Sequence, residues 1–318
     1  MYRTRRLLTL LALCPIISSA LVRAEEPAKI PSYYVEKVSS TPDLTQTEHD
    51  ARLPGKGKHY CVPVAVSNSF MWLAKNGYPR LAPKGRNALE VQAKIAGLLG
   101  SKKYMGSNPE EGTSMRGLLV GVQRYIRDRG YEYERLEYQG DSVQDREFWT
   151  GVSVPELDWI KAGLLGPSAV WLQVRSCKYR SHTNTYYYTS QSHVMTLVGY
   201  GIDKKGRRDP NVLIVHDSEG ARPKHTFFLV EQIKSGWVSR EAERAEWNRT
   251  HPPYRGRPGR LVINGKVIDA DRSAAGYVKL ADGPGITRDS YATLIDGAVV
   301  LQMKPPGPRD TDPPPEDP

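Results

Sequence analysis

The apolar pattern of this chain changes its period near residue 167, and this change limits the folds that are open to it. Before that point, apolar residues recur every three to four positions, which is typical of helices with one buried face. After it, short runs alternate apolar and polar residues, which is typical of strands. Helices that come first and strands that come second predict an α+β fold rather than alternating βαβ units.

Four helices are expected in the first part. The segment 61–75 is apolar on almost every side, which predicts a buried helix with Pro63 in its first turn. Three more helices are expected over 87–100, after a cap at Thr113-Ser114, and over 155–164 after a cap at Ser153. The polar segment before them, from residue 25 to 58, predicts an irregular lead-in.

Four strands are expected after the change of period, over 169–174, 193–200, 212–217 and 225–230. Further on, Asn264-Gly265 and Asp296-Gly297 each lie between apolar runs, which predicts two β-hairpin turns. Residues 255–304 are therefore expected to form a small C-terminal β module or an extension of the same sheet. A proline-rich stretch over 252–258 favours a boundary before it.

The N-terminal 24 residues have the layout of a secretory signal peptide. Three arginines in the first six residues precede a largely apolar stretch, and small residues follow at Ala20 and Ala24. The apolar stretch is shorter than the roughly 20 residues that cross a bilayer, and Pro15 interrupts it. We therefore expect an exported protein, periplasmic or extracellular, cleaved after Ala20 or Ala24 and free of the membrane afterwards.

The remaining polar features predict solvated surface. The formal net charge is +10, but the basic clusters lie in turn-rich stretches without interleaved aromatic residues, so no nucleic-acid partner is expected. Residues 305–318 are rich in proline and acidic residues and lack apolar side chains, which predicts a disordered tail. Trp171 and Gln173 are interpreted as sheet packing rather than as groove residues.

Cys61 is expected at the first residue of the buried helix. There, unpaired backbone N–H groups and the helix dipole favour a thiolate. His193 begins one predicted strand and Asp217 ends the next, so neighbouring strands can place the two side by side. A thiolate, an imidazole for proton transfer and a carboxylate to orient that imidazole are the components of a cysteine hydrolase. His216 competes with Asp217, but adjacent strand residues point to opposite faces, and a carboxylate orients an imidazole better.

This ordered set resembles the papain-like cysteine peptidases, and within them the bacteriocin-processing (double-glycine leader) peptidases. The run Cys-Val-Pro-Val-Ala-Val-Ser-Asn from Cys61 is similar to the family's Cys-Gly-Pro-x-Ala-x-x-Asn, and the run from His193 ends in Gly-Tyr-Gly. The similarity covers roughly residues 50–230 and implies a papain-like domain over 25–250, with N-terminal helices packed on an antiparallel sheet.

The resemblance also implies an activity and the roles of three residues. Cys61 would be the nucleophile, His193 the general acid and base, and Asp217 the orienting group, in a peptidase that acts on a peptide or protein without any cofactor. One feature departs from the family, because Gly55 stands where a glutamine usually helps to stabilise the oxyanion. A second oxyanion donor can then come from Lys58, His59 or Gln46, and the sequence does not choose among them.

Other interpretations of the same residues stay open. Cys61 can be a buried structural thiol or can pair with Cys177, the only other cysteine after the signal peptide. The histidines 193, 216 and 225 lack the spacing of metal ligands, so no metal is expected. A cell-wall amidase of the NlpC type has the same order of cysteine and histidine, but the 132-residue gap from Cys61 to His193 speaks against that compact domain. A non-catalytic peptide-binding module is favoured by the absent glutamine and disfavoured by the retained triad.

Overall fold

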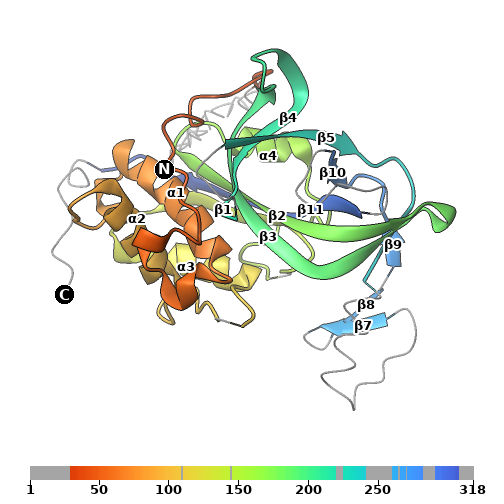
Figure 1. Ribbon diagram of the computed structural model, residues 1–318, viewed down its shortest axis with the longest axis horizontal. Coiled ribbons are helices and arrows are strands. Elements are labelled where there is room, and N and C mark those ends of the chain that lie inside the picture. Colours follow the sequence, from red (N-terminus) through yellow and green to blue (C-terminus); the bar gives the residue numbers. More distant parts are fainter. Residues whose placement is uncertain are drawn as a thin grey trace, which may run out of the picture. The chain divides into compact units, whose positions relative to one another are not determined.

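The computed structural model describes residues 29–108, 110–143, 145–219, 225–240, 260–263, 266–269, 271–281 and 291–307 (Figure 1). The expected signal peptide, the stretch 252–258 and residues 308–318 of the expected tail lie outside these ranges. From Pro31 onward the chain clusters into a single unit. No helix within the described ranges is long and apolar enough to cross a membrane.

The described residues contain four α-helices, as expected. They are α1 (Cys61–Lys75), α2 (Ala88–Gly100), α3 (Met115–Asp128) and α4 (Leu157–Gly163). Short 3-10 helices are η1 (His49–Ala51), η2 (Pro54–Gly57), η3 (Pro79–Leu81) and η4 (Ser181–Thr183). The predicted cap of α3 is confirmed, since the Ser114 side chain accepts a hydrogen bond from the N–H of Gly117. The predicted cap of α4 is wrong: the helix begins after Glu156, whose N–H bonds to Gln139 at 2.8 Å, and Ser153 lies outside it.

Nine of the described strands form one sheet. In chain order they are β1 (Tyr133–Gly140), β2 (Ser168–Arg180), β3 (Thr185–Ile202), β4 (Arg208–His216), β5 (His225–Gln232), β6 (Trp237–Ser239), β9 (Asp271–Ser273), β10 (Val278–Leu280) and β11 (Tyr291–Met303). The four predicted strands correspond to parts of β2, β3, β4 and β5. The strand β1 was not predicted, because its sequence Tyr-Glu-Arg-Leu-Glu-Tyr-Gln-Gly is mostly polar.

Antiparallel pairing closes part of this sheet on itself. The strand β2 pairs with β3, β3 with β4, β4 with β5, β5 with β10, β10 with β11, and β11 with β2 again. The strand β1 adds to β11, β6 runs parallel to β3, and β9 pairs with β6. The result is a barrel-like ring, with α1, α2 and α3 grouped on one side of β2 and β3 (Figure 1).

Among the C-terminal strands that the structure describes, three extend the large sheet, which was one of the two alternatives expected for residues 255–304, and β7 (Arg260–Ile263) and β8 (Lys266–Asp269) form a separate two-stranded sheet. The strands β9, β10 and β11 belong to the large sheet, and β11 pairs with β1, β2 and β10. The strands on either side of Asn264-Gly265 pair as the predicted hairpin requires, since β7 is antiparallel to β8, and the two turn residues lie outside the described ranges. The turn predicted at Asp296-Gly297 is wrong, because both residues lie within β11 at an irregularity of its pairing with β2. Asp296 is fully buried there beside Arg175, so a buried ion pair replaces the expected exposed turn.

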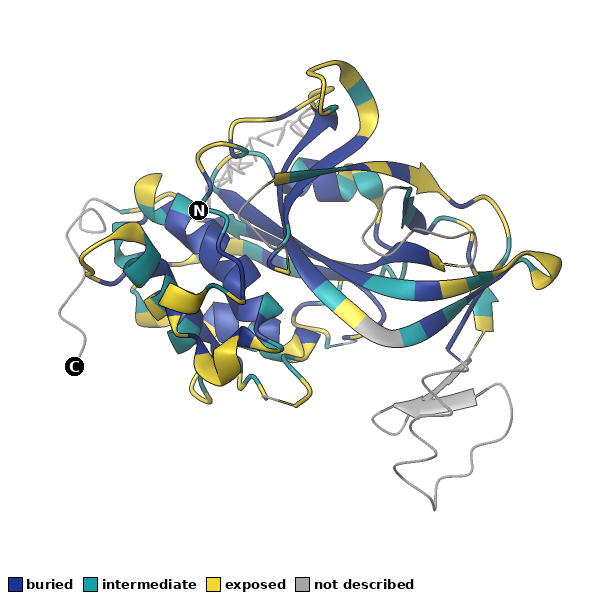
Figure 2. Ribbon diagram, in the orientation of Figure 1, coloured by how far each residue is buried: buried dark blue, intermediate teal, exposed yellow. Residues whose placement is uncertain are grey.

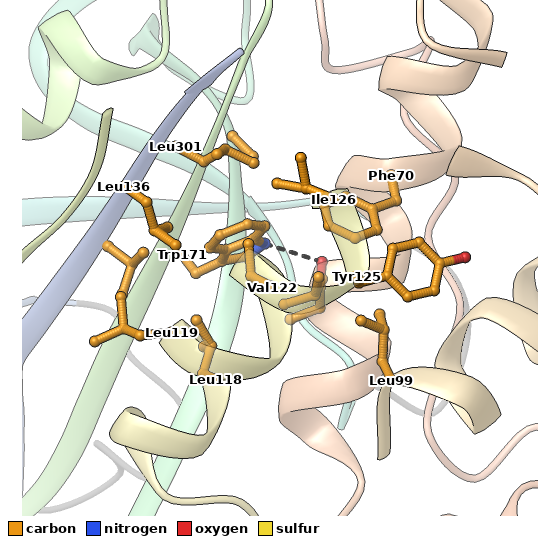
Figure 3. Close-up of a cluster of buried hydrophobic side chains, with 14 of the residues drawn as sticks. Phe70, Leu99, Leu118, Leu119, Val122, Tyr125, Ile126, Leu136, Trp171 and Leu301 are labelled. Atoms are coloured by element: carbon orange, nitrogen blue, oxygen red, sulfur yellow. Dashed lines mark hydrogen bonds between the residues drawn. The ribbon is translucent and has the colours of Figure 1, made fainter. Parts of the chain in front are cut away.

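The helices join the sheet through one apolar core. Every residue of α1 from Val62 to Met71 is buried, as its sequence predicts (Figure 2). Trp171 of β2 is fully buried among side chains of α1, α3 and the sheet (Figure 3). Its indole N–H donates to the carbonyl oxygen of Ala65 in α1 at 3.2 Å. Trp171 is therefore a packing residue, as expected, and it fixes the helix that begins with Cys61.

Candidate active site

Cys61 is the first residue of α1 and is only partly buried. It belongs to the first turn, whose N–H groups have no acceptor within the helix, so the positive end of the helix dipole lies at the sulfur. No carboxylate occurs in that first turn to neutralise this end. The positive end of the helix dipole is thus not neutralised by an acidic side chain of its own first turn.

His193 and Asp217 are brought together by the pairing of β3 with β4. His193 Nε2 lies 2.7 Å from Asp217 Oδ1, and both side chains are largely buried. The same carboxylate oxygen accepts the N–H of Glu219 at 3.0 Å, which fixes its orientation. His216 turns away, as the alternation of strand residues predicts, and its Nδ1 lies 3.2 Å from the carbonyl oxygen of Pro42.

The electrostatics of this pair favour a charged imidazole. Burial alone lowers the pKa of His193, but the hydrogen bond to Asp217 and the interaction with Cys61 outweigh it and raise the pKa to about 10. Burial alone raises the pKa of Asp217, but the hydrogen bond and charge of His193 lower it overall. Because Nε2 is taken by Asp217, the ring nitrogen left for the thiol is Nδ1, which has no hydrogen-bond partner among the described residues.

A second carboxylate stands near the same imidazole. Glu219 Oε1 lies 3.6 Å from His193 Nδ1, at an exposed position two residues after Asp217. Sequence reasoning missed this residue, although the run Asp-Ser-Glu after a strand was a signal for it. The carboxylate of Glu219 therefore lies on the side of the ring nitrogen that does not bond to Asp217.

The described part of the lead-in, residues 29–58, is irregular as expected apart from two short 3-10 helices, and its residues 34–46, here called the strap, support the site. The N–H of Gln46 donates to the carbonyl oxygen of Ser218 at 2.8 Å, next to Asp217. The N–H of Leu44 donates to Asn68 Oδ1 of α1 at 3.1 Å. The strap therefore connects the helix that begins with Cys61 to the end of β4, where Asp217 lies.

Cys61 and His193 line one pocket of about 930 Å³. One wall is the connection from α2 to α3, and another is the segment after β1, which includes Asp141 and Ser142. Gln173 also lines the pocket, so its interpretation as plain sheet packing is wrong. Its amide nitrogen donates to Ser142 Oγ at 3.1 Å, which holds the amide at the pocket wall.

The three candidates for a second oxyanion donor differ in whether they line this pocket. His59 lines it, together with Cys61 and His193, whereas Lys58 and Gln46 are not among its lining residues. Gln46 is buried and Lys58 is exposed. Of the three candidates, only His59 is therefore among the residues that line the pocket with Cys61.

The disulfide alternative is contradicted by the structure. Cys61 and Cys177 are both free, and Cys177 is fully buried in β2 within a different apolar cluster. Burial raises the pKa of the Cys177 thiol, which keeps it protonated and unreactive. The described residues contain no group of three or more His, Cys, Asp or Glu side chains placed to hold a metal ion.

The three residues predicted from their order in the sequence thus lie at one site. What the sequence did not predict is the rest of the pocket, because its walls come from connections far apart in the chain. No known family model matches the chain, and no curated protein matches it either. The case for a function therefore depends on the geometry of these side chains.

Proposed function

We propose that the protein is a cysteine hydrolase of the papain-like type that cleaves peptide bonds through a thioester. The observation that supports this most is the placement of His193, which bonds to Asp217 through Nε2 and interacts with Cys61 at a helix N-terminus. Helices that bear the cysteine and an antiparallel sheet that bears the histidine agree with the layout that the family resemblance implies.

The first half of the reaction would form the thioester. In the resting pair the proton of Cys61 already resides on His193 Nδ1, so Sγ attacks the carbonyl carbon directly to give a tetrahedral intermediate. When the C–N bond breaks, the imidazolium returns this proton to the departing amine. The raised pKa of His193 keeps the imidazolium available until that moment.

The second half would release the acid. A water molecule gives one proton to His193 Nδ1 as its oxygen attacks the thioester carbon. Collapse of this second intermediate breaks the C–S bond, and the sulfur leaves as an anion beside the imidazolium, which keeps the proton taken from water and restores the resting pair. Asp217 stays ionised throughout and holds the ring so that Nδ1 faces the sulfur.

Hydrolysis of a peptide library by the purified protein, with fragments identified by mass spectrometry, tests this proposal. We expect cleavage by the wild type and none by Cys61→Ala, while Cys177→Ala remains active as the matched control. Equal activity in the Cys61→Ala protein would refute the proposal. If the protein binds intact peptides and its Cys61 is unreactive, it is a binding module instead. If it cleaves peptidoglycan and no peptide of the library, it is a cell-wall amidase.

We also propose that the chain is exported, as its N-terminal residues predict. N-terminal sequencing of the protein recovered from the cell envelope or medium tests this. A mature end at Leu21 or Glu25 is expected, and recovery of the uncleaved chain from the cytoplasm would contradict it.

A further inference from the structure

The backbone just before Cys61 adopts conformations that L-residues rarely take. Four non-glycine residues of the described chain have positive φ, and Arg52, Lys56 and His59 are three of them. His59, two residues before Cys61, has φ of 60°. Such a conformation costs about 1–2 kcal/mol per residue and persists only where the surroundings enforce it.

Close packing enforces this conformation around His59. Gly57 lies so near the carbonyl of Gln46 that a Cβ on Gly57 would be 1.5 Å from that oxygen. The N–H of Tyr60 donates to the carbonyl oxygen of Gly57 at 3.0 Å. On the other side, a Cβ on Gly112 would lie 3.5 Å from the Cβ of His59. His59 is therefore held between η2 and the connection from α2 to α3.

The imidazole of His59 is available to a ligand. It is half-buried and lines the same pocket as Cys61 and His193. Within the described ranges no hydrogen bond or ion pair ties its side chain to another residue. Either protonation state of an imidazole carries at least one N–H donor. A donor held in place by strained backbone beside a nucleophile is what an oxyanion requires.

We infer that His59 donates the second hydrogen bond to the oxyanion, beside the backbone N–H of Cys61. This inference depends on the proposed hydrolase function and names the group that replaces the family's glutamine. When Sγ adds to the substrate carbonyl, the oxygen gains the electron pair of the C=O π bond, and the imidazole N–H of His59 would donate a hydrogen bond to it. The proton stays on His59, because the bond is a donated hydrogen bond and not a proton transfer.

The first test compares the steady-state kinetics of His59→Ala, His59→Gln and the control Lys58→Ala. Loss of one oxyanion donor lowers kcat by about 10²–10³-fold, so we expect that loss in the alanine variant with KM unchanged. The glutamine variant keeps an N–H donor and should recover much of the rate, and Lys58→Ala should match the wild type. A wild-type kcat in His59→Ala would overturn the inference, as would an equal loss in the folded glutamine variant.

The second test separates the oxyanion from the thiolate. A peptide aldehyde adds to Sγ, its oxygen takes the thiol proton, and the resulting hemithioacetal oxygen occupies the proposed oxyanion site. Iodoacetamide alkylates the same sulfur by displacing iodide and forms no such oxygen. We expect His59→Ala to weaken aldehyde binding and to leave the alkylation rate unchanged.

The outcomes distinguish the two proposals. A slower alkylation in the alanine variant would show that His59 acts on the sulfur or on the fold, which overturns the inference alone. Unchanged aldehyde affinity would overturn it too. A wild-type protein that hydrolyses no peptide and binds no aldehyde would instead overturn the hydrolase proposal itself.

Discussion

Replacing Asp217 by asparagine removes the charge that faces His193 and keeps the shape of the side chain. Asparagine can still accept the Nε2–H through its amide oxygen, so the ring should stay in place. The variant therefore tests electrostatics rather than packing. We expect the pKa of His193 to fall, and with it the population of imidazolium at neutral pH.

The size of the effect follows from the environment of His193. The difference between its pKa of about 10 and the ordinary 6.5 corresponds to about 5 kcal/mol in favour of the charged ring. Asp217 and Cys61 share this stabilisation, and both act against the cost of burial. An opposite charge at such close range changes a pKa by about 1–3 pH units. The titration midpoint of His193 should therefore fall by that amount in the variant.

An NMR titration of histidine ring carbons measures this directly, with the His193 signal assigned from a His193→Gln sample. Asp128→Asn is the matched control, because Asp128 pairs with Lys103 at the surface, at a half-exposed position. The high-pH limb of kcat/KM should move down together with the NMR midpoint. A His193 midpoint that stays at its wild-type value in Asp217→Asn would refute the electrostatic role assigned to Asp217.

Three further predictions concern stability. Asp296→Ala removes a fully buried carboxylate from an ion pair and should lower the free energy of unfolding, measured in urea, by about 3–5 kcal/mol. The control Glu231→Ala, in a surface pair, should lower it by about 0–1 kcal/mol. Equal losses in the two variants would contradict the prediction. Gly201→Ala would place a Cβ 2.3 Å from the backbone oxygen of Ser32, whereas Gly206→Ala, also at positive φ, meets nothing within 4 Å. We expect Gly201→Ala to unfold more easily by about 1–3 kcal/mol, and equal midpoints would refute the clash. The pKa of His193 is raised, so its charged ring stabilises the fold below pH 6.5. This contribution to the free energy of unfolding should be lost as the pH rises towards about 10. A free energy of unfolding that stays constant over this interval would contradict the prediction.

The sequence predicted most reliably what depends on neighbouring residues. The helix from Cys61 and the cap at Ser114 follow from local apolar spacing and from one side chain next to one turn. The turn at Asp296-Gly297 failed because its local signal is overridden by distant partners, above all Arg175 of β2. A polar strand such as β1 and a closed ring of strands depend on pairings across the whole chain, which no local pattern reports.

The site shows the same division between local and distant information. The order of Cys61, His193 and Asp217 identified the candidate residues, but the alignment of helix and sheet depends on contacts that the sequence does not display. One carbonyl group accounts for much of that alignment. The Ala65 oxygen, one turn after Cys61, accepts both the indole N–H of Trp171 at 3.2 Å and the hydroxyl of Thr196 at 2.7 Å.

Thr196 lies three residues after His193 on β3, so this shared acceptor connects the helix turn that follows Cys61 to the strand that carries His193. Both bonds are buried, so each is costly to leave unmade, and the helix cannot slide along β3 without breaking them. The strap makes a second connection, from Asn68 of α1 to the residues beside Asp217. Two independent sets of hydrogen bonds thus hold α1, the strand of His193 and the end of β4, which explains how Cys61, His193 and Asp217 lie at one site although they are distant in sequence.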